Sequence, residues 1–374
     1  MHGKVLLLSQ RRISDLVAFC LAYELEDTLQ AVTGAERIDA SDFASLEFSR
    51  RAYKLTRLLS GSPRLAAQLA PTPRGAVTLS GEYDLFFPIF SNAFELYSLA
   101  TIPDWRRRCR KAVCFITEVW TDQLPPYLLE LLSEFDHIFT GLQHCVEDVA
   151  RITGRPCSYL PLATDVLRFA PALPGQPRPI EVCNIGRRSQ TTHHALLADA
   201  ARRGSFYYYD TVAASGTDMK QRTFRVDNAQ EHRLMLATLL KHSQFFIANR
   251  SHVNNPEFTA GRDEISARFY EGMAAGTVMI GEAPRIAEFE RQFDWPDAVI
   301  HLPFDSPDVS SILKDLNSNQ QRLATVRARN VREAALRHDW LHRIRTVFDL
   351  VGLAPTEKMQ QRAEQLAGIA AQGG

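Results

Sequence analysis

The chain holds 374 residues, in which 43 basic side chains are balanced by 43 acidic ones. A chain of this length can form two domains, each with its own core. The balanced charge excludes a global field that would attract nucleic acid, and no apolar run reaches the roughly 18 residues of a transmembrane helix. The six cysteines form no CxxC pair, so we expect reduced thiols, no zinc site and a cytoplasmic protein.

Strand and helix patterns alternate through the first half of the chain. Short β-rich runs predict strands at 4–9, 83–90, 111–120 and 136–141. Apolar residues at helical spacing predict helices at 13–32, 125–135 and 143–154. This alternation favours an α/β fold with a parallel sheet that is covered by helices on both faces.

A proline-rich stretch interrupts the alternation, which then starts again. Strands are predicted at 180–186, 206–212, 244–248 and 277–281, with helices between them and a long helical stretch at 320–353. We therefore expect two similar α/β domains with parallel sheets, and we expect ligands to bind beyond the carboxyl ends of the strands. The predicted boundaries are an N-terminal domain at 1–165, a linker at 166–179, a C-terminal domain at 180–340, and a final segment at 341–374 that ends in a disordered tail from 367.

The segment 264–284 places acidic residues just ahead of a helix with few charges. Ser266 is a good N-cap, the expected helix runs to Ala275, and Gly276 suits the left-handed position that follows a helix. The amino end of this helix is expected at the carboxyl ends of the strands. Its free N–H groups and the positive end of its dipole make it a natural phosphate site.

Charged side chains around this helix suggest how a nucleotide would be held. Arg268 in the first turn could donate charge-assisted hydrogen bonds to a phosphate, or form a structural ion pair. Glu271 lies one turn further among apolar neighbours, and a carboxylate there suits the paired hydroxyls of a ribose. Asp263 or Glu264, in the preceding loop, could reach a sugar ring, or could only complement the helix dipole.

Further candidates follow other predicted strands. Arg187 comes after a strand and a glycine, and Arg188 is its neighbour. Glu118, beyond a buried strand of the first half, could bind an acceptor hydroxyl or act as a base, although a turn would explain it equally well. The ends of two more strands carry polar residues that suit either a ligand or a plain loop: Asn249, Arg250 and Ser251, and also Gln10 and Arg11.

Two other patterns bear on partners and metals. The basic run 105–111 could face an anionic lipid surface or a pyrophosphate-linked acceptor, or it could be a solvated helix face. The eleven histidines show no HExxH spacing, and His193 and His194 suit a helix start better than a metal site.

An acid, seven residues, and then Glu-Gly-Met-Ala-Ala-Gly-Thr ahead of an apolar strand (263–280) resembles the donor-site signature of GT-B glycosyltransferases. The segments YLPLATDVLRFAP (159–171), NIGRR (184–188) and HDWLHRIRTVFDLVGL (338–353) are similar to parts of the retaining, family-4-like group. The likeness covers most of residues 135–353. It implies two Rossmann-like domains with parallel sheets facing each other across a cleft, and a C-terminal helix that crosses back to the first domain.

The resemblance also implies an activity. It suggests a hexosyltransferase-type glycosyltransferase that moves a sugar from a nucleotide-diphosphate sugar to an acceptor hydroxyl, with retention of configuration. In that reading Arg187 and Arg268 would bind the donor phosphates, Glu271 the ribose, and Asp263 or Glu264 the sugar. These arginines and the helix dipole would take the place of a metal, and no cofactor other than the donor substrate is needed. The acceptor would be a carbohydrate, a lipid-linked intermediate or a small molecule.

The sequence departs from the family pattern at three points. Asp263 stands in the register of the first acid, whereas Glu264 is one position short of it. No lysine follows Arg187 shortly, so Arg188 or Lys220 would have to replace it, and the first loop has no glycine-rich run. The alternatives are therefore an epimerase or glycoside phosphorylase on the same architecture, or a non-catalytic protein that binds nucleotides or carbohydrates.

Overall fold

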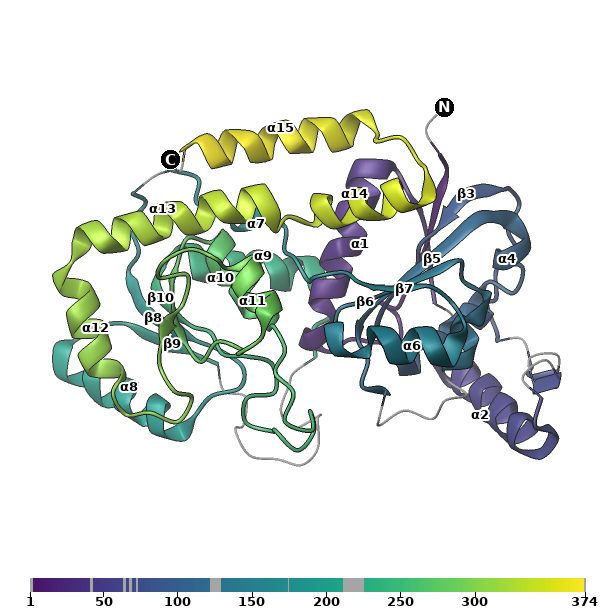
Figure 1. Cartoon of the computed structure of the whole chain (residues 1–374), viewed down its shortest axis with the longest axis horizontal. Coiled ribbons are helices and arrows are strands. Elements are labelled where there is room, and N and C mark those ends of the chain that lie inside the picture. The colour runs from purple at the N-terminus through teal and green to yellow at the C-terminus, as the bar shows by residue number, and fades with distance from the viewer. Residues whose placement is uncertain are drawn as a thin grey trace. The chain divides into compact units, whose positions relative to one another are not determined.

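The chain forms two compact units, each built around a parallel sheet (Figure 1). The computed structural model describes residues 3–40, 43–62, 65–66, 69–71, 73–121, 129–173, 175–210 and 225–372. The first unit comprises Met1–Asp15, Ala22–Leu162 and Arg343–Gln360. The second unit comprises Leu16–Leu21, Ala163–His342 and Gln361–Gly374. Within the described parts of the chain, no helix has both the length and the hydropathy to cross a membrane.

The sheet of the first unit is parallel throughout its described strands. These are β1 (Val5–Ser9), β2 (Glu36–Asp39), β3 (Tyr83–Phe86), β4 (Ile89–Asn92), β5 (Cys109–Glu118), β6 (His137–Thr140) and β7 (Cys157–Tyr159). They pair in the order β2-β1-β3-β5-β6-β7, and β4 pairs with β5. Every residue of β1 is buried, as is typical of parallel strands that are covered on both faces. The single strand predicted at 83–90 is instead two short strands, because Pro88 lacks the N–H group that a ladder needs.

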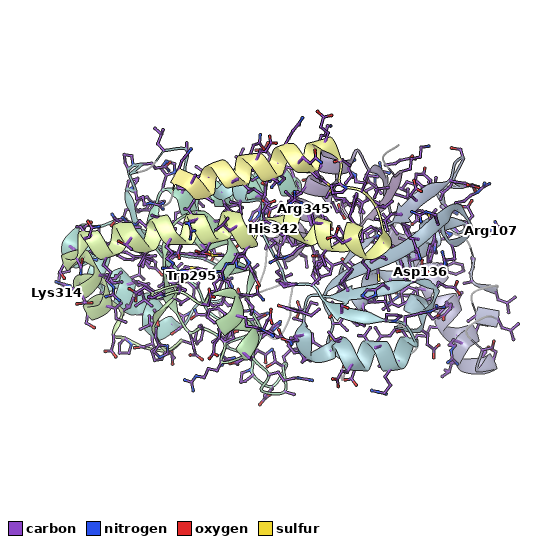
Figure 2. All side chains as sticks on the ribbon, turned by 45° about the horizontal axis from the view of Figure 1, so that its top comes forward. Arg107, Asp136, Trp295, Lys314, His342 and Arg345 are labelled. Atoms are coloured by element: carbon purple, nitrogen blue, oxygen red, sulfur yellow. The ribbon has the colours of Figure 1, made fainter. Side chains whose placement is uncertain are left out.

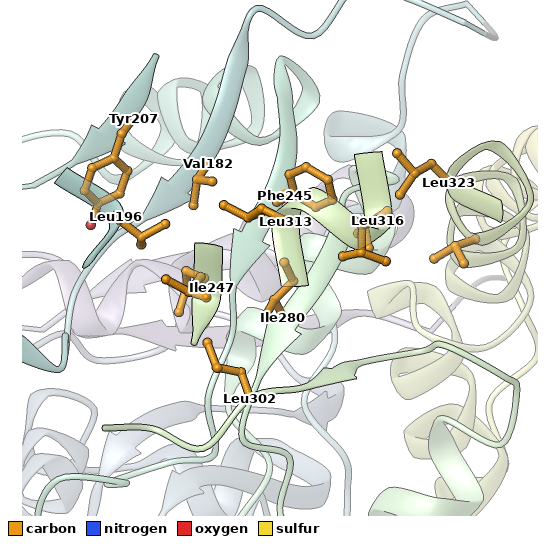
Figure 3. Close-up of a cluster of buried hydrophobic side chains, with 13 residues drawn as sticks. Val182, Leu196, Tyr207, Phe245, Ile247, Ile280, Leu302, Leu313, Leu316 and Leu323 are labelled. Atoms are coloured by element: carbon orange, nitrogen blue, oxygen red, sulfur yellow. The ribbon is translucent and has the colours of Figure 1, made fainter. Parts of the chain in front are cut away.

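The sheet of the second unit is smaller and also parallel. Its described strands are β8 (Ile180–Asn184), β9 (Tyr207–Tyr209), β10 (Ser243–Ile247), β11 (Val278–Gly281) and β12 (Ile300–His301), in the order β12-β11-β10-β8-β9. Figure 3 shows a core cluster of this unit, in which Phe245, Ile247 and Ile280 of the central strands pack against leucines of the covering helices. The predicted α/β fold with parallel sheets in two domains is therefore confirmed.

The helices in the described residues connect and cover these strands. In chain order, the α-helices are α1 (Cys20–Thr33), α2 (Phe43–Ser60), α4 (Trp105–Arg108), α6 (Val146–Thr153), α7 (Val166–Phe169), α8 (Gln190–Arg203), α9 (Ala229–Lys241), α10 (Ala267–Ala274), α11 (Ala287–Gln292), α12 (Val309–Ser318), α13 (Gln320–Arg337), α14 (Trp340–Val351) and α15 (Glu357–Gln372). Short 3₁₀ helices are η1 (Val17–Phe19), η2 (Ala93–Thr101), η4 (Glu130–Glu134) and η5 (Gln143–Cys145). The long helical stretch predicted at 320–353 is thus divided between α13 and α14.

The predicted disordered tail is wrong, because α15 continues to Gln372. Leu366 and Ala370, one helical turn apart, are buried, so the apparently featureless tail has an apolar face. The helix is also anchored by Arg362, whose Nη2 lies 2.7 Å from Asp339 Oδ2 and 2.6 Å from Asp165 Oδ1. The sequence did not predict this buried face, because alanine and glycine give the tail little hydrophobic contrast.

The proline-rich residues 166–179, expected as a linker, belong to the second unit. Arg178 attaches this stretch to α9, β10 and α10 of the second unit. Its Nη1 donates to the carbonyl oxygens of Leu240 (3.3 Å) and Ser243 (2.7 Å), and its Nη2 donates to that of Ala275 (2.9 Å). One guanidinium therefore satisfies carbonyls at the carboxyl ends of both α9 and α10, where a cation also complements the helix dipole.

Candidate functional site

Helix α10 forms as its sequence predicts. Ser266 is its N-cap, with Oγ accepting a hydrogen bond from the backbone N–H of Arg268 at 3.2 Å, and Ala275 is its C-cap. Gly276 follows with φ of 64°, a conformation that costs a glycine little and other residues more. Its single turn leads straight into β11, so the helix is held close to the sheet.

A cavity of about 330 Å³ lies at the amino end of α10. Its walls come from the residues that follow β8 (185–187), from Tyr208 and Asp210 at the end of β9, from α9, from α10 and from residues 17–21. All of these residues belong to the second unit. The cavity thus occupies the carboxyl ends of parallel strands, where α/β folds bind their ligands.

Glu271 is held at the wall of this cavity by a buried ion pair. Its Oε1 accepts from Arg233 Nη1, and both side chains are almost completely buried. Arg233 Nη2 also donates to Thr164 Oγ1 at 3.0 Å, and its guanidinium lies 4.9 Å from the ring centroid of Phe169. Buried charges persist only when they are paired and hydrogen-bonded in this way. The pair therefore fixes the orientation of the Glu271 carboxylate.

Arg268 lies directly over the backbone of Gly186. A Cβ atom at position 186 would stand 2.0 Å from Arg268 Nη2, and the φ of Gly186 is +77°. The backbone N–H of Gly186 donates to Asp210 Oδ2 at 2.6 Å. Both the turn and the close approach of the guanidinium thus require glycine here. Burial lowers the pKa of Arg268, although the charges of Glu271 and Asp210 oppose this shift.

The cavity combines cationic and neutral donors. Arg187 and Arg268 line it from two different elements, and His232 lines it from α9. Burial and the nearby Arg233 lower the pKa of His232, while Glu271 acts against them. The imidazole is therefore neutral at neutral pH, and the positive charge of the wall comes from the arginines and from the amino end of α10.

The remaining candidates of the second unit lie outside the lining of this cavity. Arg188 forms an ion pair with Asp210 and lies 5.5 Å from the ring centroid of Tyr209. Arg188 therefore helps to hold the Asp210 carboxylate, which accepts the hydrogen bond from the Gly186 N–H. Lys220, the other substitute for the missing family lysine, lies outside the described residues.

The acids ahead of α10 belong to the loop that follows β10. Arg250 bridges two of its neighbours, with Nη1 3.2 Å from Asp263 Oδ1 and Nε 3.0 Å from Glu282 Oε1. Asn249 Oδ1 accepts from the backbone N–H of Glu282 at 2.8 Å, and Glu264 is buried. These contacts hold the loop in shape, and the roles of Asp263 and Glu264 toward a sugar stay predictions.

The candidates of the first unit are separate from this cavity. Glu118 Oε1 accepts from Trp120 Nε1 at 2.7 Å. Arg11 pairs with Glu26 at 3.0 Å and with Asp27 at 2.6 Å, while Gln10 is fully buried. In the second unit, His193 lies within α8 and its Nδ1 is 2.8 Å from the Tyr207 hydroxyl. Among the described residues, no group of three or more His, Cys, Asp or Glu is arranged to hold a metal ion.

Sequence reasoning missed Arg233, His232 and Asp210. A signal for Arg233 was present, because the buried residues of α9 are Arg233, Leu236, Ala237 and Leu240. This spacing of three, four and seven places an arginine on the apolar face of a helix, which requires a buried acidic partner. The sequence around Asp210 and His232 shows no comparable pattern. Their place at the cavity depends on how β9 and α9 are arranged in the fold.

Comparison with known proteins bears on this arrangement. Residues 192–349 match the model of a family described as glycosyl transferase-like. No curated protein sequence matches the chain.

The comparison with solved structures gives one match that supports the fold, and a second with a slightly lower score. An alpha-glucosyltransferase in complex with UDP and a 13-mer DNA has a TM-score of 0.50 at 10 % identity, over 94 % of this chain and 100 % of that chain. The alpha,alpha-trehalose-phosphate synthase (UDP-forming) from Burkholderia vietnamiensis has a TM-score of 0.48 at 12 % identity, over 96 % and 99 % of the two chains. The chain therefore has the GT-B fold of glycosyltransferases, and its residues 192–349 carry the sequence pattern of the glycosyl transferase-like family.

Proposed function

We propose that the protein transfers a glycosyl group from a nucleoside diphosphate sugar to an acceptor hydroxyl, with the donor bound in the cavity at the amino end of α10. The observation that carries the proposal is the joint presence of Arg187, Arg268, Glu271 and the amino end of α10 around one cavity. Cations and free N–H groups suit a diphosphate, and a fixed carboxylate suits a diol. The match of residues 192–349 to a glycosyl transferase-like family supports the same reading.

The proposed chemistry uses positive charge where negative charge develops. The acceptor oxygen forms a bond to the anomeric carbon while the bond from that carbon to the β-phosphate oxygen breaks, and the acceptor proton leaves with the departing diphosphate or a nearby base. Arg187, Arg268 and the helix dipole would stabilise the leaving phosphate in the transition state. Asp263 or Glu264 would orient the sugar, provided that the loop after β10 brings one of them to the donor.

Metal independence and retention of configuration are finer parts of the same proposal. The arginine side chains would supply the charge that a divalent cation provides in other transferases. Transfer that persists in EDTA would support the first part, and an axial glycosidic bond from an axial donor would support the second. Loss of transfer in EDTA, restored by added magnesium, would contradict the role given to the arginines.

The first test is binding of nucleotides, four diphosphates and the monophosphate CMP, measured by calorimetry and by thermal shift. UDP is the first ligand to test, because a structure of the same fold contains it, followed by GDP, ADP, dTDP and CMP. We expect one nucleotide to raise the melting temperature, since ligand at about 100 times its Kd stabilises by about 2.7 kcal/mol. Arg268→Gln should weaken that binding at least about tenfold, a loss of roughly 1.4 kcal/mol or more.

A matched control and a second assay make the result decisive. Arg202→Gln changes an exposed arginine of α8, on the surface of the same unit, and should leave nucleotide binding unchanged. Release of the nucleoside diphosphate from its sugar in the presence of acceptor carbohydrates then tests transfer itself. If the nucleotide binds and no sugar-nucleotide is ever consumed, the protein is a binding protein on this fold. If no nucleotide binds, the proposed site is wrong.

A further inference from the structure

Helix α2 carries an apolar face that is exposed to solvent. Leu58 and Leu59 are 80 % and 78 % exposed, and Phe48 and Leu55 are each exposed over more than half of their surface. Counted from Leu55, these residues lie at −7, +3 and +4, which is the spacing of one helix face. The opposite face, with Leu46, Ser49 and Tyr53, is buried. The helix therefore has two apolar stripes. One packs into the first unit and the other faces solvent.

The chain that follows α2 exposes two further leucines. Leu65 and Leu69 are 47 % and 65 % exposed. Exposed leucines placed singly are ordinary on protein surfaces, but a contiguous group this large normally marks an interaction site. Figure 1 shows α2 at the margin of the first unit, away from the strands of its sheet.

The charge around this face is strongly biased. The whole chain is balanced, with 43 basic and 43 acidic residues. Residues 43–74 hold a single acid, Glu47, against basic residues at 50, 51, 54, 57, 64 and 74. Arg57 is paired with Glu130 at 2.9 Å and Arg50 with Glu47, which leaves Arg51 and Lys54 as the exposed cations beside the leucines. The ion pair of Arg51 with Glu47, at 3.1 Å, is an exposed one, so it withdraws little of that positive charge.

An apolar stripe flanked by lysine and arginine is the composition of helices that lie in the interface of an anionic bilayer. The leucine and phenylalanine side chains enter the boundary between head groups and acyl chains, and the basic side chains contact the lipid phosphates. A partner protein that buried this face would also have to be acidic. A second copy of the chain does not fit well, because two such faces would bring like charges together.

The basic run 105–111, which the sequence suggested as a membrane contact, lacks these features. Three of its four arginines form ion pairs with acids of the same unit, Arg106 with Asp136 at 3.0 Å, Arg108 with Asp104 at 3.5 Å, and Arg110 with Asp84 at 3.4 Å. What distinguishes this run from α2 is the lack of an exposed apolar stripe. Its one aromatic residue, Trp105, is buried. Arg107, labelled in Figure 2, is exposed, but no apolar side chain of this run accompanies it to the surface.

We propose that the outer face of α2, made by Phe48, Arg51, Lys54, Leu55, Leu58 and Leu59, binds the surface of anionic lipid membranes. This surface is independent of the nucleotide cavity. It would bring the protein to acceptors that are themselves anchored in a bilayer.

The test is sedimentation of the full chain with vesicles of phosphatidylcholine alone or mixed with an equal part of phosphatidylglycerol. We expect binding to the mixed vesicles, weaker binding to the neutral ones, and a decrease as salt is raised. Leu58→Ser together with Leu59→Ser should weaken binding at least about tenfold, since each leucine loses its burial in the bilayer. Arg51→Glu with Lys54→Glu should weaken it by a similar factor and abolish its salt dependence.

Matched controls come from elsewhere on the surface. Leu336→Ser with Leu350→Ser removes two leucines that are 45 % and 49 % exposed, and Arg107→Glu with Lys111→Glu reverses two exposed charges of the other basic run. Both pairs should leave binding unchanged. In addition, a tryptophan introduced by Leu58→Trp should shift its emission to the blue when mixed vesicles are added.

Three results would overturn the proposal. The first is no binding of the unmodified protein to mixed vesicles, and the second is full binding by the Leu58→Ser, Leu59→Ser variant. The third is a concentration-dependent dimer, seen by sedimentation velocity, that this same variant abolishes, because the face would then serve a second copy. All the substituted side chains are exposed, so melting temperatures within about a degree of the unmodified protein should show that folding is retained.

Discussion

Buried acids are compensated by an arginine in both units, as for Glu26 and Arg11 in the first, but one buried acid of the first unit has only neutral partners. In the second unit, Glu271 is paired with Arg233, and Glu181 with Arg203 at 2.6 Å. In the first unit, Glu95 is buried and receives hydrogen bonds from Ser14 Oγ at 2.8 Å and from the backbone N–H of Ser91 at 2.6 Å. Neither of those partners is charged. Glu181 is therefore compensated by a charged partner, whereas Glu95 is compensated only by neutral donors.

This difference shows in the pKa values. Burial raises the pKa of Glu95 to about 7, and the hydrogen bonds from Ser14 and Ser91 reduce that shift only in part. Burial alone would also raise the pKa of Glu181, but its contacts with Arg203 hold that pKa below its ordinary value of 4.5. A folded protein can thus compensate a buried acid with an arginine or leave it to bind a proton. Only the first solution provides fixed charge, and it is the one found around the candidate donor cavity.

The largest effect is expected from removing one partner of the buried pair. Arg233→Met removes the ion-pair partner of the buried Glu271, which should lower the free energy of unfolding of the second unit by about 3–5 kcal/mol. Urea denaturation followed by hydrogen exchange of β8 and β10 amides would measure it. Arg233→Met combined with Glu271→Leu should recover most of this stability and still fail to bind nucleotide. If Arg233→Met alone were as stable as the unmodified protein, the buried ion pair with Glu271 would not be the compensation that it is taken to be.

A somewhat smaller effect is expected from pH in the first unit. Because the folded pKa of Glu95 lies above its unfolded value of 4.5, the folded state holds a proton that the unfolded state releases. Stability is full below pH 4.5, falls as pH rises toward 7, and loses about 3 kcal/mol in total. Glu95→Gln should remove the part of this dependence that Glu95 contributes, since the amide can still accept from Ser91 and donate to Ser14; Glu26, whose pKa burial also raises to about 7, keeps its own part. Hydrogen exchange of β1 and β5 amides between pH 5 and about 8 would reveal it. An unchanged slope in the variant would mean that Glu95 is not the titrating group.

Gly186→Ala tests the arrangement that brings Arg268 to the acids. The added methyl group would meet Arg268 Nη2 and displace the guanidinium from Asp210 and Glu271. We expect nucleotide affinity to fall at least about tenfold, beside a stability loss of about 1–2 kcal/mol for the positive φ.

Gly204→Ala is the control for this substitution. Gly204 has a φ of +66° with nothing within 4 Å of the added atom, so it should lose similar stability without any change in binding. Equal binding defects in the two variants would show that the effect comes from the backbone and not from Arg268.

The smallest effect concerns Glu181 and has the opposite pH dependence. Since its folded pKa lies below the unfolded value of 4.5, its contribution is full above pH 4.5 and is lost as pH falls through the folded pKa. Glu181→Gln should therefore destabilise the second unit by about 1 kcal/mol at pH 7 and have a smaller effect near pH 3. Thermal unfolding at the two pH values distinguishes this outcome. A destabilisation that is equal at both values would contradict the assigned ion pair.

Much of the candidate site could be predicted from local sequence. Ser266, the apolar helix and Gly276 define α10 by rules that act over a few residues, and Arg268 and Glu271 inherit their positions from that helix. The position of Arg187 could be predicted for the same reason, because it directly follows a strand and a glycine. The pairing of Glu271 with Arg233 was not, since 38 residues separate them along the chain and only the packing of α9 beside α10 joins them.

The errors have a physical origin as well. The tail was expected to be disordered because alanine and glycine show little hydrophobic contrast, yet Leu366 and the ion pairs of Arg362 suffice to anchor it. The acids that face the basic run 105–111, such as Asp84 and Asp136, could not be named from the sequence, because they are distant along the chain. Helix α2 was not among the helices predicted from the sequence, and only the exposure of its side chains in the structure shows that an apolar stripe faces solvent.

Arg178 has a practical consequence for anyone who divides this chain. The proline-rich stretch is apparent from sequence, and a cut at Ile180 would seem to separate the two halves cleanly. Such a cut would remove the guanidinium that binds the carbonyls of Leu240, Ser243 and Ala275, and would leave the ends of α9 and α10 without that donor. A chimera or an isolated fragment of the second unit should therefore begin at Ala163. It then keeps the proline-rich stretch together with α9 and α10, whose terminal carbonyls Arg178 binds.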